Sequence, residues 1–518
     1  FGYSGTIAHA LLRYADGERP HTFLQPFKHT LVRQPICWHT LSTTSMATTT
    51  YAASWVMQRN DAVVRRAHFL LLGEVMPQCL VESLITSHSL TAVATLLLAS
   101  GRSGVPSLQA ATAFIALTQA ASSRGKTTKL LILTCGVVAA SPTHPASSTA
   151  HGGSWGLARV IRLEQSKLRA QSVDTSMSAE GAQMLVMASS KMEAEAAVGD
   201  GVVYAARVRA CFAVLTPGAT VAYGHYVING GLGGLGLRAA ALLVEGLAMH
   251  AVLASRSGHV ARGGQGLEAQ FKLLSQSVTA SACDSADLSD TCQVVRFGPL
   301  SGVLHAAGVG DKGLLLELAA NRVAWASSSK AFGAYFLQCA VAATPLQTQI
   351  FFSSIGSGLG NVGQANYAIG NASLDALAIA RRAGGMTACS LQWPLVGGAG
   401  MGAAAFSSVG ERQLAISGLA GISLEEYAAC VSTHLVAIYT ISTSVRMAHR
   451  SDVRELVRDL ADASQPRFSE LVAEEGDASI VRSVVVAPVL TGGVLAGELA
   501  PLAPVQRRGH VEATVLRA

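Results

Sequence analysis

Charge is scarce in this sequence, since only 14% of its 518 residues are Asp, Glu, Lys or Arg, while 50% are hydrophobic. A chain with this much apolar material can bury large cores, so disorder of the whole chain is excluded, and its length predicts two to four structural units. The net charge of +6 is small for this length, and Lys and Arg are scattered. Because no basic stripe with interleaved aromatics occurs, we expect no nucleic-acid binding.

Paired cysteines are also lacking, because the nine cysteines lie far apart and none forms a CxxC pair. An odd number without framework spacing predicts reduced thiols that pack as small hydrophobic side chains. No His and Cys residues have the spacing of zinc ligands, so we expect no metal.

Long uninterrupted hydrophobic runs and a targeting signal are absent as well. The most apolar late stretch, residues 484–505, is interrupted by Pro488, Pro501, Pro504 and Glu498. These residues argue against a membrane span and favour a linker. The chain begins at Phe1 with neither an initiator Met nor a signal-peptide pattern, so targeting stays open, and we expect a soluble, cytoplasmic protein without membrane contact.

What the sequence does contain is an alternation of short apolar runs with helical stretches. In the first half, strands are expected at His68–Val75 and Lys129–Gly136, a helix or strand at Thr91–Ser100, and an amphipathic helix at Ser154–Leu168. Continuous hydrophobicity in such runs is typical of parallel strands that are covered on both faces.

A second alternating run starts at Tyr226. It predicts strands at 226–229, 250–258, 301–309, 349–357 and 387–393, and helices at 237–248, 321–343 and 367–382. Strand–helix alternation predicts an α/β doubly wound parallel sheet with its ligand site at the carboxyl ends of the strands. Two such runs predict two tandem Rossmann-like subdomains, and only the second has a phosphate loop. Later, Ser423 and Glu426 have capping-box spacing before another helix.

A GxGxxG pattern follows the strand at 226–229 and precedes a helix. Glycines in this context allow a tight turn and a close approach of the backbone to a pyrophosphate, which the helix N-terminus favours. The pattern therefore predicts dinucleotide binding by Gly231, Leu232, Gly233, Gly234, Leu235 and Gly236.

The end of the next predicted strand carries Ser255 and Arg256 in place of the acid that selects NAD. An Arg can pair with a ribose 2′-phosphate, which an acid would repel, so the sequence favours NADPH over NADH.

Four further residues indicate carbonyl reduction. Tyr367 and Asn371 are four apart on a predicted helix and share a face, Ser354 ends a predicted strand, and Lys330 lies upstream. Reduction needs hydrogen bonds to the developing alkoxide and an acid that protonates it. A Tyr can act as this acid if a nearby ammonium lowers its pKa, although each residue alone is more commonly a packing, capping or solvated one.

The order and spacing of these motifs resemble the ketoreductase of modular polyketide synthases, a member of the short-chain dehydrogenase/reductase superfamily. The resemblance covers Tyr226–Met401, including SSSKAFGA, FFSSIGSGLGNVGQANYAIGN and SLQW. It implies that Tyr367 donates the proton, Ser354 binds the keto oxygen, Lys330 lowers the pKa of Tyr367, and Asn371 supports the site. It also implies cofactor contacts at Asp284, Ala306, Ala307 and Gly308.

The resemblance extends to the rest of the chain and predicts its organisation. Residues 1–14 are similar to the end of a ketosynthase, with His9 as its histidine, and 15–50 to the linker that follows it. Residues 51–220 are similar to a truncated structural subdomain and 221–475 to the catalytic NADPH-binding subdomain, while 476–518 form a linker that leads to a carrier protein. The expected partners are an acyl carrier protein bearing the β-ketoacyl thioester and a neighbouring ketosynthase, within a homodimeric parent synthase.

The sequence departs from the family at several positions. Pro394-Leu395-Val396 replaces the usual Gly-Pro-Trp, and a helix between Asp284 and His305 is shortened. Leu359 stands where Trp is common in enzymes that give L-hydroxyls, which favours a D-hydroxy product. The Leu-Asp-Asp signature of the enzymes that give D-hydroxyls appears here as Gly310-Asp311-Lys312, so Lys312 replaces its second Asp. The alternatives to an active reductase are an inactive scaffold of the synthase and a free-standing alcohol dehydrogenase; the upstream Lys and the ketosynthase-like start argue against the latter.

Overall fold

The structure is a computed structural model, and it describes residues 48–58, 70–73, 92–97, 104–123, 129–141, 145–175, 193–199, 202–211, 223–246, 248–261, 266–398, 422–436, 444–449 and 464–470. The chain divides into two units, Phe1–Met46 and Ala47–Ala518, and every described residue belongs to the second. The predicted ketosynthase end, with His9, the terminal linker and most of the linker at 15–50 lie outside the described residues.

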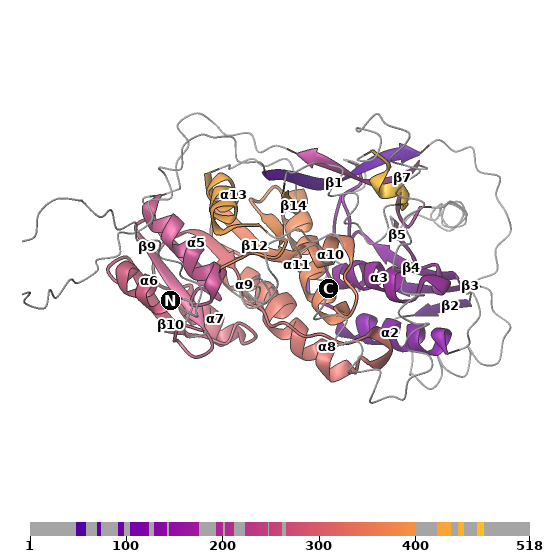
Figure 1. The fold of residues 1–518 in the computed structure, drawn as a ribbon, viewed down its shortest axis with the longest axis horizontal. Helices are drawn as coiled ribbons and strands as arrows, with labels where there is room; N and C mark the ends of the chain where they lie inside the picture. The colour runs from indigo at the N-terminus through magenta and orange to yellow at the C-terminus, as the bar shows by residue number, and fades with distance from the viewer. Residues whose placement is uncertain are drawn as a thin grey trace, which may run out of the picture. The chain divides into compact units, whose positions relative to one another are not determined.

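The described strands form one sheet of 14 strands (Figure 1). Its spatial order is β10-β9-β8-β11-β12-β13-β14-β1-β7-β6-β5-β4-β3-β2. The strands are β1 (Thr48–Gln58), β2 (Leu70–Gly73), β3 (Ala92–Leu97), β4 (Lys129–Cys135), β5 (Gln171–Thr175), β6 (Glu195–Gly199), β7 (Val202–Cys211), β8 (His225–Asn229), β9 (His250–Ser255), β10 (Val278–Ala282), β11 (Leu300–His305), β12 (Thr348–Ser354), β13 (Cys389–Trp393) and β14 (Ser444–His449).

Helices connect these strands. The α-helices are α2 (Leu108–Ser122), α3 (Gly152–Glu164), α5 (Gly234–Glu245), α6 (Leu267–Leu274), α7 (Leu288–Val294), α8 (Ala320–Ser327), α9 (Gly333–Ala340), α10 (Ile355–Leu359), α11 (Ala365–Ala383) and α13 (Leu424–Val436). The described residues also form the short 3₁₀ segments η2 (Ser166–Leu168), η3 (Leu315–Glu317) and η6 (Pro466–Phe468), and the π-helical turn η4 (Ser328–Phe332).

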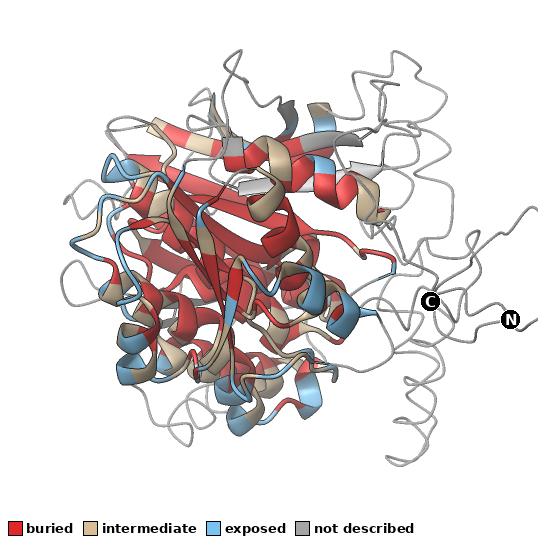
Figure 2. Cartoon of the chain, turned by 90° about the vertical axis from the view of Figure 1, so that its left-hand side faces the viewer, coloured by how far each residue is buried: buried red, intermediate tan, exposed pale blue. Residues whose placement is uncertain are grey.

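In the run β10-β9-β8-β11-β12-β13-β14, each strand is parallel to the next one. The interior strands β8, β9, β11, β12 and β13 are almost wholly buried, and Figure 2 shows the strands of the sheet largely in the colour of buried residues. Burial on both faces explains why these strands are continuous apolar runs in the sequence. The predicted doubly wound parallel sheet is confirmed.

The two halves of the chain share this sheet. We call the described residues between 48 and 211 the structural half and those between 223 and 449 the catalytic half. Strand β1 joins them, because it pairs antiparallel with β14 on one side and with β7 on the other. It begins at Thr48, inside the segment for which the sequence predicts a linker. β-branched Thr residues favour a strand once neighbours are available on both sides.

Most predicted elements are present with small shifts of their ends. The ambiguous segment Thr91–Ser100 is a strand, β3. Helix α3 ends at Glu164 rather than Leu168, because the backbone of Gln165 leaves the helical region and η2 follows. The single helix expected at 321–343 is divided into α8, η4 and α9. The predicted capping box is confirmed by reciprocal hydrogen bonds between Ser423 and Glu426, at 2.8 and 3.2 Å.

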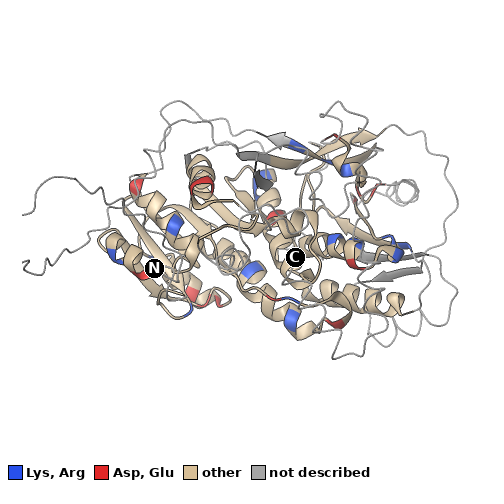
Figure 3. Cartoon of the chain, viewed as in Figure 1, with Lys and Arg blue, Asp and Glu red and all other residues tan. Residues whose placement is uncertain are grey.

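Few side chains of the described part are charged (Figure 3). None of its helices combines the length and apolar character needed to cross a membrane. Within the same residues, no three His, Cys, Asp or Glu side chains are grouped as a metal would require. Six cysteines of the described part are not disulfide-bonded, namely Cys135, Cys283, Cys292, Cys339, Cys389 and Cys430.

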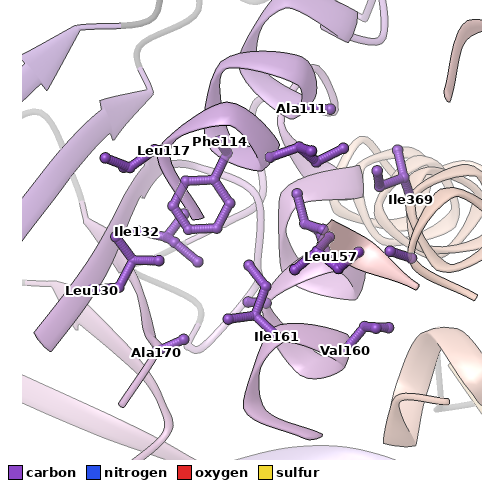
Figure 4. Close-up of a cluster of buried hydrophobic side chains, with 14 of the residues drawn as sticks. Ala111, Phe114, Leu117, Leu130, Ile132, Leu157, Val160, Ile161, Ala170 and Ile369 are labelled. Carbon is purple, nitrogen blue, oxygen red and sulfur yellow. The ribbon is translucent and has the colours of Figure 1, made fainter. Parts of the chain in front are cut away.

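Helix α3 of the structural half packs closely against α11 of the catalytic half. A Cβ on Gly156 would lie 2.4 Å from the carbonyl oxygen of Ala368, and one on Gly152 would lie 2.3 Å from the Cβ of Ala376. Glycines on this face therefore allow the two backbones to approach closely. Next to the contact, side chains of α2, α3, β4 and α11 form one buried apolar cluster that contains Phe114, Leu157 and Ile369, all labelled in Figure 4.

Replacing Gly156 by Ala should destabilise the protein by about 1–3 kcal/mol, because the added methyl group overlaps the backbone of α11. In a helix without this neighbour, the same change would be stabilising by about 0.5–1 kcal/mol. Chemical denaturation would measure the free energy of unfolding. Gly384→Ala is the matched control, since its Cβ would meet its nearest atoms at 3.4 and 3.6 Å. A G156A variant as stable as the wild type would show that the helices are farther apart.

Candidate active site

The glycine turn connects β8 to α5 and is closed on its inner side. Gly230 has a φ of +77°, and a Cβ there would lie 2.5 Å from the backbone nitrogen of Ala307. A Cβ on Gly236 would lie 2.3 Å from the carbonyl oxygen of Gly230. A Cβ on Gly233, in contrast, would meet among the described atoms only the Gly230 carbonyl oxygen, at 3.2 Å. The turn therefore has open space beside Gly233 that a side chain would fill.

The first turn of α5 is suited to an anion. Gly233 is its N-cap residue and no side chain caps the helix, so its first N–H groups and its dipole are available to a phosphate. Tyr427 of α13 holds this turn, because its hydroxyl donates to the carbonyl oxygen of Leu235 at 2.7 Å. No sequence motif indicated Tyr427. All the predicted loop residues lie on this turn or on the start of α5: Gly231, Leu232, Gly233, Gly234, Leu235 and Gly236.

The next two strand ends carry the other residues predicted for the adenosine half of the cofactor. Ser255 ends β9, Arg256 follows it, and Asp284 follows β10. The side chains of Arg256 and Asp284 are exposed. The backbone N–H of Cys283 donates to the carbonyl oxygen of Ser255 at 2.8 Å, which holds the two strand ends together. These residues are thus accessible at the edge where parallel sheets bind dinucleotides.

Residues 306–308 lie between the glycine turn and Lys330. The N–H of Ala306 donates to the carbonyl oxygen of Asn229 at 2.7 Å. A Cβ on Gly308 would lie 2.3 Å from Cε of Lys330, so only glycine leaves room for the lysine side chain. The predicted contacts Ala306, Ala307 and Gly308 therefore lie beside both the cofactor loop and the lysine.

Lys330 lies on the π-helical turn η4 and is only 4% exposed. Single π-helical turns frequently mark functional positions. Its Nζ donates to the carbonyl oxygen of Phe352 on β12 at 2.6 Å. Burial lowers the pKa of Lys330 to about 8, although the Asp375 carboxylate acts in the opposite direction. The ammonium group is thus easier to deprotonate than an exposed lysine.

Ser354, Tyr367 and Asn371 come together at the end of β12. Ser354 is the last residue of the strand and the N-cap of α10, where its Oγ accepts from the N–H of Gly356 at 3.2 Å. Tyr367 and Asn371 lie on α11, and the Asn371 side-chain amide donates to the Tyr367 carbonyl oxygen at 2.9 Å. Nζ of Lys330 is 6.0 Å from the centre of the Tyr367 ring. The structure therefore brings together the four residues predicted for reduction.

The electrostatics of Tyr367 depend on its burial and its hydrogen bonds. Burial raises the pKa of Tyr367, and hydrogen bonding with the side chains of Asn371 and Ser354 opposes this effect without reversing it. The ammonium group of Lys330 donates to the Phe352 carbonyl oxygen, at 2.6 Å. Burial dominates, so the pKa of Tyr367 is raised and the phenol stays protonated at neutral pH. That Lys330 lowers the pKa of Tyr367 stays a prediction.

No sequence pattern had indicated Asp375, a buried residue of α11 that supports the site through hydrogen bonds to neighbouring elements. Its carboxylate accepts from Ser357 Oγ at 2.8 Å and from the side chains of Ser390 and Gln392 at 2.6 Å. Asp375 thus ties α11 to α10 and β13. It lies four residues after Asn371, so the same helical period that relates Tyr367 to Asn371 was the signal that could have found it.

Two loops in front of the site are fastened to each other. Asp311 forms an ion pair with Arg322, at 2.6 Å, and accepts from the Asn366 side chain next to Tyr367. The N–H of Gly313 donates to the carbonyl oxygen of Gly363 at 2.8 Å. Asp311 thus has a structural role, which sequence reasoning did not assign.

Glu164, at the end of α3, fastens the same loops from the structural half. Its two carboxylate oxygens accept from the N–H groups of Leu315 and Gly363, at 2.7 and 2.8 Å. Burial raises the pKa of Glu164 to about 7, and the two backbone hydrogen bonds oppose the rise. A carboxylate of the structural half therefore bridges both loops of the catalytic half.

Comparison with known proteins shows what this arrangement is similar to. Residues 224–398 match the family model of the KR domain. A solved "A1-type ketoreductase" is similar to the chain with a TM-score of 0.70 and 27% identity, over 82% of this chain and 98% of that one. The ketoreductase from the first module of phoslactomycin biosynthesis in Streptomyces sp. HK803 has a TM-score of 0.66, 27% identity and similar coverage. Residues 224–398 thus resemble the KR domain, and the described structure is similar to solved ketoreductases.

Curated relatives are much longer than this chain. The spectinabilin polyketide synthase system protein NorB of Streptomyces orinoci is 35% identical over 298 residues, which are 56% of this chain and 13% of that protein. Mycoketide-CoA synthase of Mycobacterium tuberculosis is 34% identical over 265 residues, which are 49% of this chain and 6% of that protein. The similarity to these multidomain proteins therefore concerns a small part of their length.

The raised pKa of Glu164 predicts a pH-dependent stability. In the folded state its pKa is about 7 against an ordinary value of 4.5, so its contribution to stability is present below pH 4.5 and is lost as the pH rises through 7. Between pH 5 and 8 the wild type should lose on the order of 1–3 kcal/mol relative to Glu164→Gln, since one pKa unit corresponds to about 1.4 kcal/mol.

Thermal or denaturant unfolding of the wild type and E164Q across this pH range measures the difference. Glu426→Gln is a control, because that carboxylate accepts a backbone hydrogen bond at the distant capping box. Parallel pH profiles for the wild type and E164Q would contradict the assignment of a raised pKa to Glu164.

Proposed function

We propose that the chain is the β-ketoreductase of a polyketide synthase, which uses NADPH to reduce a β-ketoacyl thioester on an acyl carrier protein to the β-hydroxyacyl thioester. The observation that carries the proposal is the convergence of Lys330, Ser354, Tyr367 and Asn371 at the carboxyl ends of the parallel strands, beside the glycine turn. A neighbouring ketosynthase in the same synthase would supply the β-ketoacyl chain.

The glycine turn supports the choice of cofactor. The space beside Gly233 and the uncapped start of α5 suit a pyrophosphate, and exposed Arg256 on the next strand end suits a ribose 2′-phosphate. NADPH, when bound along this turn, supplies the hydride for the β-carbon.

The protein side chains would handle the oxygen and the proton. The hydroxyls of Ser354 and Tyr367 would donate hydrogen bonds to the keto oxygen and stabilise the negative charge that develops there. Tyr367 would then give its proton to the alkoxide, and its raised pKa keeps that proton in place at neutral pH. Asn371 would hold the first turn of α11 through the Tyr367 carbonyl, and Lys330 would provide positive charge below the site.

The hydroxyl configuration belongs to the same proposal. Leu359 closes α10 and is half-buried, in the place where the related enzymes that give L-hydroxyls often carry Trp. We therefore expect the D-hydroxy product.

Tyr367→Phe should lower the rate of β-keto reduction by about 10²–10⁴-fold, because the variant keeps the ring but loses the proton donor. The measurement is oxidation of NADPH in the presence of a β-ketoacyl thioester surrogate, together with a fluorescence titration that should show unchanged NADPH binding. Tyr335→Phe on α9 removes a hydroxyl outside the site and serves as the control. A normal rate in Y367F would refute the role of Tyr367. NADPH binding without any turnover by the wild type would indicate an inactive scaffold instead.

Arg256→Ala should weaken NADPH binding by about tenfold or more, since a hydrogen bond to a charged group is worth about 1.5–3 kcal/mol. Binding of NADH, which has no 2′-phosphate, should change little. Titration of the wild type and R256A with both nucleotides separates the two effects. Equal weakening for NADPH and NADH would mean that Arg256 does not contact the 2′-phosphate.

A further inference from the structure

Helix α10 carries the Ser354 hydroxyl at its N-terminal end and Leu359 at its other end. It has only five residues, and a helix this short has little stability of its own. The Ser354 side chain caps its first turn. The last carbonyl groups of a helix lie beyond the reach of its own N–H groups and can accept hydrogen bonds from other parts of the chain.

Two arginines from outside the catalytic half donate such hydrogen bonds. Arg159 of α3 donates to the Ser357 carbonyl oxygen at 2.8 Å. Arg467 of η6 donates to the carbonyl oxygens of Gly358 and Leu359, both at 3.1 Å. Each carbonyl oxygen of the last three residues of α10 therefore accepts from a guanidinium group.

The same two arginines are held by one buried carboxylate. Arg159 contacts Glu195 of β6 with two hydrogen bonds, at 2.7 and 2.8 Å, and Arg467 contacts it at 3.1 Å. Arg162 is the third guanidinium on this carboxylate, at 3.0 Å. The side chains of Glu195 and Arg467 are only 3% and 4% exposed.

Three guanidinium groups share the Glu195 carboxylate in this cluster, and the Asp375 carboxylate also acts on Arg159. Buried charges are costly unless they are paired and fully hydrogen-bonded. The carbonyl oxygens at the end of α10 are negative ends of backbone dipoles, so they complete the solvation of Arg159 and Arg467. Moving α10 away would leave both cations incompletely bonded, and the cluster therefore opposes such a movement. The backbones at the end of α10 and in α3 are also close together, because a Cβ on Gly360 would lie 2.8 Å from the Arg159 carbonyl oxygen.

We propose that Arg159 and Arg467 are positioning residues, which cap the C-terminal end of α10 and thereby fix where the Ser354 hydroxyl and the Leu359 side chain face the substrate. The inference rests on the proposed ketoreductase function and adds residues from the structural half and from η6 to it. Neither arginine touches the reacting atoms, so each acts through α10. The segment that carries Arg467 is consequently part of the working enzyme.

The test uses Arg467→Lys in the full chain. One ammonium keeps the charge beside Glu195 but cannot reproduce the fork that reaches both Gly358 and Leu359. We expect kcat for the β-ketoacyl surrogate to fall by about tenfold, since small misplacements of a catalytic group cost one to two orders of magnitude. NADPH binding should be unchanged, and the ratio of D- to L-alcohol should drop.

A double-mutant cycle with Ser354→Ala separates positioning from a general loss of stability. If Arg467 acts through Ser354, R467K should cause less than about a twofold further loss in the S354A background. Arg207→Lys is the matched control, because Arg207 forms a similarly buried ion pair with Glu193 in the structural half, at 2.8 Å. R207K should have the same small effect in both backgrounds. A normal rate and a normal alcohol ratio in R467K, or equal losses in both backgrounds, would overturn the proposal.

Amide hydrogen exchange gives a readout that does not depend on turnover. Exchange across residues 354–360 should become faster in R467K and stay unchanged in R207K, even if the wild type proves inactive and the proposed function fails. Unchanged exchange in R467K would overturn the capping role by itself. Should R467K fail to fold, Arg159→Lys, which loses the bond to Ser357, is measured in the same way with the same expected and contrary results.

Discussion

The contact between α3 and α11 is the constraint on which the candidate active site depends. Helix α11 carries Tyr367 and Asn371, and its position relative to the sheet is set by a neighbour from the other half of the chain. Glycines at 152 and 156 leave out the side chains that would keep the two helices apart, so the backbone of α3 lies directly against backbone atoms and alanine methyl groups of α11. Because such a contact cannot adjust by rotating side chains, it fixes α11 more firmly than an ordinary side-chain interface does.

That close approach also explains how the structural half reaches the site. From the end of α3, Glu164 binds the loop before Tyr367 and the loop after Asp311, and Arg159 reaches the end of α10. The structural half keeps the parallel strands of a Rossmann-like unit, but it has no phosphate loop. Its buried side chains Glu164 and Arg159 bind loops and a helix end of the catalytic half. The structural half therefore supports a site that it does not itself contain.

Burial governs the chemistry that the four central residues can perform. It disfavours the charged forms of both Lys330 and Tyr367, lowering the pKa of the ammonium group and raising that of the phenol. The phenol is therefore kept in the form that can donate a proton. The buried carboxylate of Asp375 accepts hydrogen bonds from the side chains of Ser357, Ser390 and Gln392. These bonds hold α11 in place beside α10 and β13.

The sequence by itself determined the elements and the residue types of the site. Apolar runs marked the buried strands, the glycine pattern between β8 and α5 marked the cofactor turn, and the four-residue spacing placed Tyr367 and Asn371 on one helical face, because these signals are local and periodic. Only the tertiary structure decided that β1 joins both halves in one sheet, that Lys330 lies on a π-helical turn facing Phe352, and that Glu164, Arg159 and Arg467 hold the site loops. Except for the contact between Lys330 and Phe352, these contacts join residues that are about a hundred or more positions apart in the sequence. No local sequence pattern encodes such contacts. The contacts of Glu164 and Arg159 arise because α3, packed on α11, buries charged groups together with backbone atoms that must be hydrogen-bonded.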